Sequence, residues 1–435
     1  MSWGLPTFRH GVHPPENKEA TESLPIERVP FVREYVLPLA QHIGRPAKAV
    51  VEVKDRVERG ALIAEPDGFV STAIHAPVTG TVTAIELRPH PSGKLELAIV
   101  IEADPFANQR MPKTSGLGDL SDIVGRVQRG GLVGLGGAAF PSHVKLSLPE
   151  GKRVSFVIIN GCECEPYLTC DHRVMAERPQ AVVRGLQIMM EVLGAERGYL
   201  GIEANKPDAI EALRAAIRGH RGLEVVPLAV KYPQGAEKML IDAILEREVP
   251  AGGLPLDLEI VVNNSGTAAA LADLIDDGLP LIERVVTVTG PGVRRPANLL
   301  VPIGTPLMAL LEHCDGLRPE TRQVVLGGPM MGQAQKRLDI PILKGTSGVL
   351  ALTEVNVEAE QPCIRCGRCL EACPMFLNPS RLALLVRAEQ VDALESSHQM
   401  SCFECASCSY VCPSRIPLVQ LMRVGKGLLR EAAGR

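Results

Sequence analysis

The chain has 435 residues, 46% of them apolar and only 3% aromatic, so its cores must be built from aliphatic side chains. The formal charge of −4 gives no reason to expect nucleic-acid binding. No apolar run approaches the roughly 18 residues of a membrane-spanning helix, and the polar, proline-rich start predicts no signal peptide. Twelve cysteines in a chain this long indicate bound metal rather than a disulfide framework.

Residues 45–87 contain short predicted strands. Segments 50–64 and 75–82 resemble the two halves of a lipoyl- or biotinyl-type sandwich. Such modules carry a lysine at the hairpin tip between the halves, but here the tip falls near Asp67, Gly68 and Phe69. We therefore expect a docking module rather than a swinging-arm carrier.

The central region alternates strands with helices. Strands are predicted at 153–160, 198–202, 223–232 and 258–263, and helices at 179–193 and 207–218, with a further helix after each of the last two strands. This alternation predicts an α/β sheet covered by helices.

A glycine-rich run precedes the first of these strands, with glycines at 130, 131, 134, 136 and 137. Glycine lets the backbone approach a ligand and offer N–H groups to an anion, and Lys145 follows at a distance suited to a phosphate. The run is neither a Walker loop nor a Rossmann fingerprint. A purely structural glycine loop is the alternative.

Acidic residues follow the same strand. Glu163 and Glu165 lie at its carboxyl end, where α/β sheets bind ligands, and their carboxylates could accept ribose hydroxyls. An ordinary solvated acidic pair is the alternative.

Four segments of this region resemble the flavoprotein subunit of respiratory NADH dehydrogenase: the glycine loop with Lys145, residues 160–173, the loop 232–237 and the turn 261–267. The resemblance implies that Glu163, Glu165 and Glu237 line a nicotinamide dinucleotide, with Gly235 in the same cofactor-binding loop. It implies that FMN is held by Gly134, Gly136, Gly137, Lys145, Asn160, Asn263, Asn264 and Thr267. Leu135 and Cys162 depart from the family's pattern.

Residues 284–330 resemble a β-grasp domain of the soluble-ligand-binding type. In the respiratory enzyme such a domain also follows the flavoprotein domain. We expect it to connect and position its neighbours, and assign it no chemistry.

The C-terminal segment contains two runs with the spacing C-x2-C-x2-C-x3-C-P, which is the spacing of two-cluster bacterial ferredoxins. It predicts two 4Fe–4S clusters, and two zinc sites are the alternative. We expect the fourth cysteine of each run to start a helix that crosses to the other cluster. One cluster is therefore expected to be held by Cys363, Cys366, Cys369 and Cys412, and the other by Cys402, Cys405, Cys408 and Cys373.

The remaining parts of this segment are predicted to be helical, with one helix over 379–394 and another over 416–429. The other cysteines fit no common cluster. Cys162, Cys164 and Cys170 are interpreted as ordinary thiols and Cys314 as a core residue.

The opening residues 7–26 and the order of the modules closely resemble the family of the C subunit of the Rnf (also called Rsx) electron-transport complex. The resemblance implies a peripheral electron-transfer protein on the cytoplasmic side of the cell inner membrane. Its expected cofactors are two 4Fe–4S clusters and FMN, with NAD(H) as substrate. Its expected partners are the other subunits of the complex and ferredoxin, and those subunits would translocate Na+ or H+.

No catalytic acid–base residue is expected, because hydride transfer requires positioning more than proton exchange. Two alternatives remain. One is a soluble flavin and iron–sulfur reductase, such as the cobalamin reductase that shares these modules. The other is a non-catalytic iron–sulfur adaptor, which the departures at Leu135 and Cys162 keep open.

The sequence thus predicts an α/β multidomain fold. The expected divisions are an N-terminal arm (1–30), a barrel-sandwich module (31–110), an FMN- and NADH-binding-like α/β domain (111–280), a β-grasp domain (281–354) and a ferredoxin-like domain with two clusters (355–435).

Overall fold

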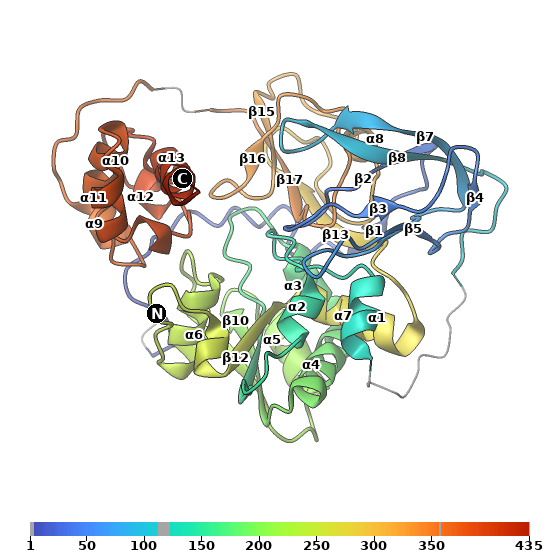
Figure 1. The fold of residues 1–435 in the computed structure, drawn as a ribbon, viewed down its shortest axis with the longest axis horizontal. Coiled ribbons are helices and arrows are strands. Elements are labelled where there is room, and N and C mark those ends of the chain that lie inside the picture. Colours follow the sequence, from blue (N-terminus) through green and yellow to red (C-terminus); the bar gives the residue numbers. More distant parts are fainter. Residues whose placement is uncertain (1–3, 112–121, 356–357, 435) are drawn as a thin grey trace.

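The computed structural model describes residues 4–111, 122–355 and 358–434. The expected boundaries near 111 and 355 therefore adjoin residues that lie outside the described ranges. Figure 1 shows the two β-rich modules side by side, the α/β module packed against them, and a compact helical module at the C-terminal end of the chain. No described helix combines the length and apolarity needed to cross a membrane.

The barrel-sandwich module consists of two small sheets with the strand orders β2-β8-β7-β4 and β3-β5-β6. Alternating aliphatic side chains, among them Leu37, Ile63 and Ile101, fill the space between them. Its strands are β2 (Glu34–Pro38), β3 (Lys48–Ala49), β4 (Arg56–Val57), β5 (Leu62–Glu65), β6 (Ile74–His75), β7 (Gly80–Pro89) and β8 (Leu95–Ala103).

The tip of this module rests on the α/β module. The Phe69 carbonyl accepts a hydrogen bond from Nε2 of His143 (2.6 Å), and the Gly68 carbonyl accepts one from Gln128 (3.0 Å). These contacts support the interpretation as a docking module.

The α/β module is built on a parallel sheet with the order β11-β10-β9-β12. Helices α4 and α7 pack against each other so closely that a Cβ at Gly185 would overlap the backbone of Ala268. The strands are β9 (Phe156–Asn160), β10 (Arg197–Glu203), β11 (Leu223–Leu228) and β12 (Ile260–Asn264). The helices are α1 (Ile123–Arg129), α2 (Ser142–Leu146), α3 (Cys170–Glu177), α4 (Pro179–Leu193), α5 (Pro207–Ala216), α6 (Glu237–Leu245), η1 (Pro255–Leu258) and α7 (Ser265–Asp277).

The next module contains a mixed sheet with the order β1-β14-β13-β17-β15-β16. Its edge strand β1 (Ile26–Arg28) comes from the N-terminal arm and pairs in parallel with β14, which the sequence did not predict. Cys314 lies in its core, as expected. The other elements are β13 (Glu283–Thr289), β14 (Ala297–Pro302), α8 (Leu307–His313), β15 (Gln323–Leu326), β16 (Gln333–Ala334) and β17 (Gly348–Leu352).

The C-terminal module differs from the prediction in two details. The single helix expected over 379–394 is two helices, because the chain breaks at Glu389, which has a positive φ of 50°. Cys373 follows the end of a helix instead of starting one, and so does Cys412. The elements are α9 (Arg368–Ala372), α10 (Pro379–Arg387), α11 (Val391–Ser396), η2 (Gln399–Ser401), α12 (Ser407–Tyr410) and α13 (Leu418–Ala433).

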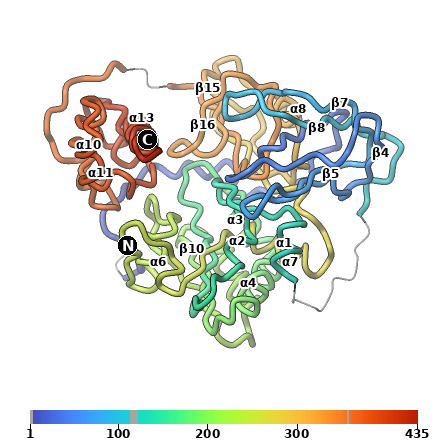
Figure 2. Tube along the Cα trace, viewed as in Figure 1, coloured from blue at the N-terminus to red at the C-terminus, as the bar shows by residue number. Residues whose placement is uncertain are grey.

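The N-terminal arm runs between the C-terminal module and the α/β module (Figures 1 and 2). Val12 and Tyr232 exchange backbone hydrogen bonds of 2.8 and 2.9 Å, which ties the arm to the loop after β11. The Gly11 N–H donates to the Ala372 carbonyl (3.2 Å) in the C-terminal module. The arm therefore connects these two modules directly.

Lys344 joins three modules at one buried point. Its Nζ donates to the carbonyls of Ala73 in the barrel sandwich and Gly131 in the α/β module, both at 2.7 Å. Burial lowers the pKa of Lys344 to about 7. Lys344 therefore adds one desolvated polar contact to the junction of these modules.

A Lys344→Met chain is expected to lose about 2 kcal/mol of stability, because two buried carbonyls would lose their donor. Chemical denaturation of the two proteins measures this difference. Lys336→Met removes an exposed lysine of the same module and is the matched control. Equal stability of all three proteins would contradict the prediction.

Candidate functional site

A cavity of about 420 Å³ opens where the α/β, β-grasp and C-terminal modules meet, and we call it the interdomain cavity. Most of its wall comes from the carboxyl ends of β9 and β12 and from the loop after β11, the edge where α/β sheets bind ligands. Met331, Ser401 and Phe403 complete the wall from the other two modules. The volume lies within the range of small-molecule sites.

The structure brings seven of the predicted cofactor residues to the wall of this cavity. They are Gly136, Asn160, Glu163, Glu165, Gly235, Glu237 and Asn264. Asn160 Nδ2 donates to the Gly235 carbonyl (2.7 Å), which fixes the loop after β11 against the end of β9.

Five predicted residues do not line the cavity: Gly134, Gly137, Lys145, Asn263 and Thr267. Lys145 Nζ lies 2.8 Å from Oε1 of Glu237, a wall residue, and donates to the Val262 carbonyl (2.7 Å). The Thr267 hydroxyl accepts from the Leu135 N–H (2.9 Å) and so holds the glycine loop. These two residues therefore support the wall rather than form it.

Asn263 faces away from the cavity. Its buried amide donates to Met189 Sδ in α4 (3.3 Å), whereas Asn264 caps α7 through bonds from the Gly266 and Thr267 N–H groups. Successive residues of a strand point to opposite faces. That alternation could have shown from the sequence that Asn263 and Asn264 cannot both reach one cavity.

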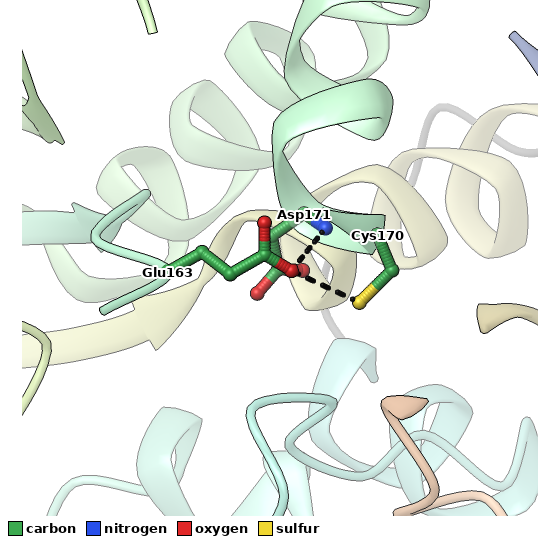
Figure 3. Close-up of side chains that lie close together, drawn as sticks. All are labelled: Glu163, Cys170 and Asp171. Atoms are coloured by element: carbon green, nitrogen blue, oxygen red, sulfur yellow. Dashed lines mark hydrogen bonds between the residues drawn. The ribbon is translucent and has the colours of Figure 1, made fainter. Parts of the chain in front are cut away.

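The carboxylate of Glu163 binds the N-terminal end of α3. It accepts hydrogen bonds from the Asp171 and His172 N–H groups (3.0 and 3.1 Å) and from the Cys170 thiol (3.2 Å). Figure 3 shows the first and last of these bonds. Glu163, Cys170 and Asp171 offer ligand atoms within 4.8 Å of one another, and the helix cap accounts for that proximity.

Asp171 lies in an unfavourable environment for a charged carboxylate. Burial, followed by the nearby charge of Glu163, raises the pKa of Asp171 to about 7, while Asn264 donates to it and the charges of Arg284 and Lys206 partly compensate. In the unfolded chain this carboxyl titrates near 3.9. Its contribution to stability is therefore full below about pH 4 and is lost as the pH rises through about 7.

Asp171→Asn is expected to remove this pH dependence. The stability of the variant relative to the natural chain should rise between pH 5 and pH 8 by on the order of 2 kcal/mol. Thermal unfolding at both pH values tests this, with the exposed Asp392→Asn as the control. A stability difference independent of pH would refute the prediction.

Glu165 binds the β-grasp module instead of pointing freely into the cavity. It accepts from the Met330 and Met331 N–H groups (3.0 and 2.7 Å), and burial raises the pKa of Glu165. A Cβ at Gly328 would overlap this carboxylate. Glu163 and Glu165, the acidic pair predicted to bind ribose, therefore hydrogen-bond to the protein's own backbone and stabilise the walls of the cavity.

Lys18 of the N-terminal arm lies beneath these residues, and sequence reasoning did not identify it. The side chain is 4% exposed, and its Nζ donates to the carbonyls of Glu163 and Glu165 (both 2.9 Å) and to the Leu168 carbonyl. Nothing in the local sequence marks it, because its partners lie about 150 residues away.

The eight cysteines of the C-terminal module form two groups around two cavities. Cys373, Cys402, Cys405 and Cys408, the near set, line one of them. Cys363, Cys366, Cys369 and Cys412, the far set, line the other. In each group, one cysteine comes from the opposite sequence run, which is the crossed arrangement of two-cluster ferredoxins.

Each of the two cavities offers four cysteine sulfurs and a largely apolar lining, which suits an iron–sulfur cluster held by four thiolates. Zinc can also take four thiolates, but the crossed pairing of the two runs is the arrangement of a two-cluster ferredoxin.

The near set and the interdomain cavity share a wall residue. Phe403, between Cys402 and Cys405 in the sequence, lines both cavities. The far set shares no wall residue with the interdomain cavity, and Cys363 and Cys366 are exposed. The near set therefore borders the interdomain cavity, whereas the far set lies apart from that cavity and has two exposed cysteines.

The lining of the interdomain cavity fits a flavin nucleotide. Gly136 and Gly235 bring bare backbone to the wall, and Asn160, Glu237 and Asn264 supply polar atoms. A Cβ at Gly137 would meet nothing within 4 Å, so the glycine loop is open on that side.

Models of four protein families match successive parts of the chain. They are the RnfC barrel sandwich hybrid domain (residues 6–105), the Nuo51 FMN-binding domain (127–273), the SLBB domain (285–334) and the 4Fe-4S dicluster domain (360–416). The predicted fold class is confirmed, as are FMN and 4Fe–4S clusters as cofactor types.

Several curated proteins are similar over most of their length. The C subunit of the proton-translocating ferredoxin:NAD(+) oxidoreductase complex of Clostridium ljungdahlii is 49% identical over 88% of this chain and 84% of that protein. The C subunit of the Na(+)-translocating ferredoxin:NAD(+) oxidoreductase complex of Acetobacterium woodii is 45% identical over 97% and 96%. The C subunit of the ion-translocating oxidoreductase complex of Rhodobacter capsulatus is 42% identical over 99% and 84%.

Proposed function

The chain belongs to the family of C subunits of ion-translocating ferredoxin:NAD(+) oxidoreductase complexes, and from this we propose that it is the electron-transfer subunit that connects NAD(H) to the iron–sulfur carriers of such a complex. The relatives are named as one subunit of a complex, which supports assembly with further subunits. Those partners would supply the ion translocation and hold this chain on the cytoplasmic side of the membrane. We also propose ferredoxin and NAD(H) as its redox partners.

The single observation that carries the proposal is the shared wall at Phe403. Because of this shared wall, the near set borders a cavity whose lining suits a flavin, while the far set has two exposed cysteines at which a partner could exchange electrons. A flavin exchanges a hydride with nicotinamide and single electrons with iron–sulfur clusters, so it can link these two chemistries when bound.

The roles of individual residues follow from their places in the site. We propose that Gly136, Asn160, Gly235 and Asn264 contact FMN, and that Gly134, Gly137, Lys145 and Thr267 hold the loop beneath it. Glu237 faces the cavity, where it can meet the dinucleotide, while Glu163 and Glu165 orient the wall. The near and far sets would each hold one 4Fe–4S cluster.

The far set is the proposed exit toward a partner. Ile364, between its two exposed cysteines, is 68% exposed, and the guanidinium groups of Arg365 and Arg368 lie on the surface beside it. An exposed apolar side chain with two arginines nearby in the chain suits an acidic redox protein.

We propose that the chain is divided into an N-terminal arm (1–30), a barrel-sandwich module (31–110), an FMN- and NADH-binding-like domain (111–280), a β-grasp domain (281–354) and a ferredoxin-like domain (355–435).

Anaerobic reduction of the full chain with NADH tests this function. The flavin absorbance should bleach first, and iron–sulfur signals should then appear without any other protein. Flavin that bleaches while the clusters stay oxidised would favour the non-catalytic adaptor. Complete activity with a soluble acceptor, without binding to membrane subunits, would favour the soluble reductase.

A further inference from the structure

Two side chains from outside the C-terminal module reach the backbone of the near set. Tyr232 Oη donates to the Cys405 carbonyl (2.8 Å), and the tyrosine is only 1% exposed. His10 Nδ1 lies 3.1 Å from the Cys373 carbonyl, so the ring must carry its proton on Nδ1 to make this bond. Both acceptors belong to near-set cysteines.

Within the described residues, the far set has no equivalent contacts from the arm or the α/β module. The Cys412 carbonyl accepts from the Arg415 N–H (3.2 Å), and the hydroxyl of Ser414 donates to the Pro362 carbonyl (3.0 Å), both within the same module. Throughout the described ranges, the donors reaching into the cluster loops from the arm and the α/β module converge on the near set and its neighbour Ala372.

Both donors have packed neighbours. The backbone of Tyr232 pairs with that of Val12 in the arm, and the side chains of Val12 and Tyr232 pack with Ala372 and Cys405 in a small apolar core. The His10 ring lies against Phe376, with 4.4 Å between ring centroids. Neither donor can therefore turn away without disturbing packed neighbours.

The direction of these bonds has an electrostatic consequence. Tyr232 is buried, and its phenol O–H donates to the Cys405 carbonyl. A fixed donor places the positive end of its dipole beside the ligating peptide. Hydrogen bonding around a cluster is one of the factors that set its reduction potential, and positive potential favours the reduced, more negative state.

We propose that Tyr232 and His10 are positioning residues that hold the near-set loops against the interdomain cavity and raise the reduction potential of the near cluster relative to the far one. This rests on the proposed function, since it requires that the near set holds a cluster. It extends that function because the arm and the loop after β11 would then help to set which of the two clusters holds the electron.

Redox titration of the full chain, followed by electron paramagnetic resonance, tests the proposal with Tyr232→Phe. The midpoint potential of one cluster should fall while that of the other stays unchanged, with FMN and iron contents equal to those of the natural chain. Tyr199→Phe removes a hydroxyl from β10 of the same module and should move neither potential. The shifted signal should persist in a Cys363→Ser background, where the far set lacks a ligand.

His10→Gln provides a second, independent variant, with the exposed His13→Gln as its control. It should lower the same potential as Tyr232→Phe. Unchanged potentials in both variants, or an equal shift of both clusters, would overturn the proposal.

The outcomes separate this inference from the proposed function. If NADH reduces the clusters of the natural chain but the Tyr232→Phe potentials are unchanged, only the inference fails. If NADH leaves both clusters oxidised in the natural chain, the proposed function fails, and the titration with a chemical reductant still tests the role of Tyr232.

Discussion

A Cys405→Ser chain is expected to bind FMN and to lose the near cluster, and with it about four iron atoms. NADH should still bleach its flavin, but reduction of the far cluster should slow by on the order of 100-fold, the upper end of what removing even a supporting group at a metal site costs. The reason is that, in the proposed function, electrons reach the far cluster by way of the near one. The near set borders the interdomain cavity at Phe403, whereas the far set shares no lining residue with that cavity.

Two comparison variants make this test specific. Cys366→Ser damages the far set and should leave NADH reduction of the near cluster intact, because the near set borders the cavity through Phe403. Cys314→Ser replaces a buried cysteine in the β-grasp core and should retain all iron. If Cys405→Ser kept its iron and its rate, or if Cys366→Ser blocked reduction as severely, the proposed order of the sites would be wrong.

Gly235→Ala is expected to lower FMN affinity at least about tenfold, which corresponds to roughly 1.4 kcal/mol. A Cβ at this position would overlap the Cys162 carbonyl, so the loop must shift. The shift would also disturb the bonds from Asn160 Nδ2 to the Gly235 carbonyl and from the Gly235 N–H to Cys164 Sγ. Each of these residues lines the interdomain cavity.

The affinity follows from the quenching of flavin fluorescence as FMN is added to flavin-free protein. Gly427→Ala is the matched control, because a Cβ there meets nothing within 4 Å and its helix α13 lies in the C-terminal module. Iron content should be unchanged in both variants. FMN affinity equal to that of the natural chain in Gly235→Ala would show that the loop after β11 does not form part of the flavin site.

The parts of the fold that the sequence could predict are those with a local apolar pattern or a fixed spacing. The buried strands show such a pattern, since parallel strands covered on both faces read as short continuous apolar runs. The two cysteine runs have a spacing that cluster geometry sets. The break at Glu389 was missed because the apolar pattern continues across it on both α10 and α11.

The site itself was predictable only in part. Sequence reasoning located the carboxyl ends of β9 and β12, but the roles of Glu163 and Glu165 depend on α3 and on Met330 and Met331, which come into contact only in the folded chain. The same applies to Lys18, His10 and Tyr232, which act through backbone carbonyls far away in the sequence. Every residue carries a backbone carbonyl, so the sequence does not show which carbonyl will accept a given hydrogen bond.

Iron, acid-labile sulfide and zinc measured per chain on anaerobically purified or reconstituted full-length protein give the most direct test of the central claim, that the near and far sets hold two 4Fe–4S clusters beside a flavin. We expect about eight iron atoms, about eight sulfide ions and one FMN per chain. Two zinc ions in place of the iron, bound by the same cysteines, would contradict it.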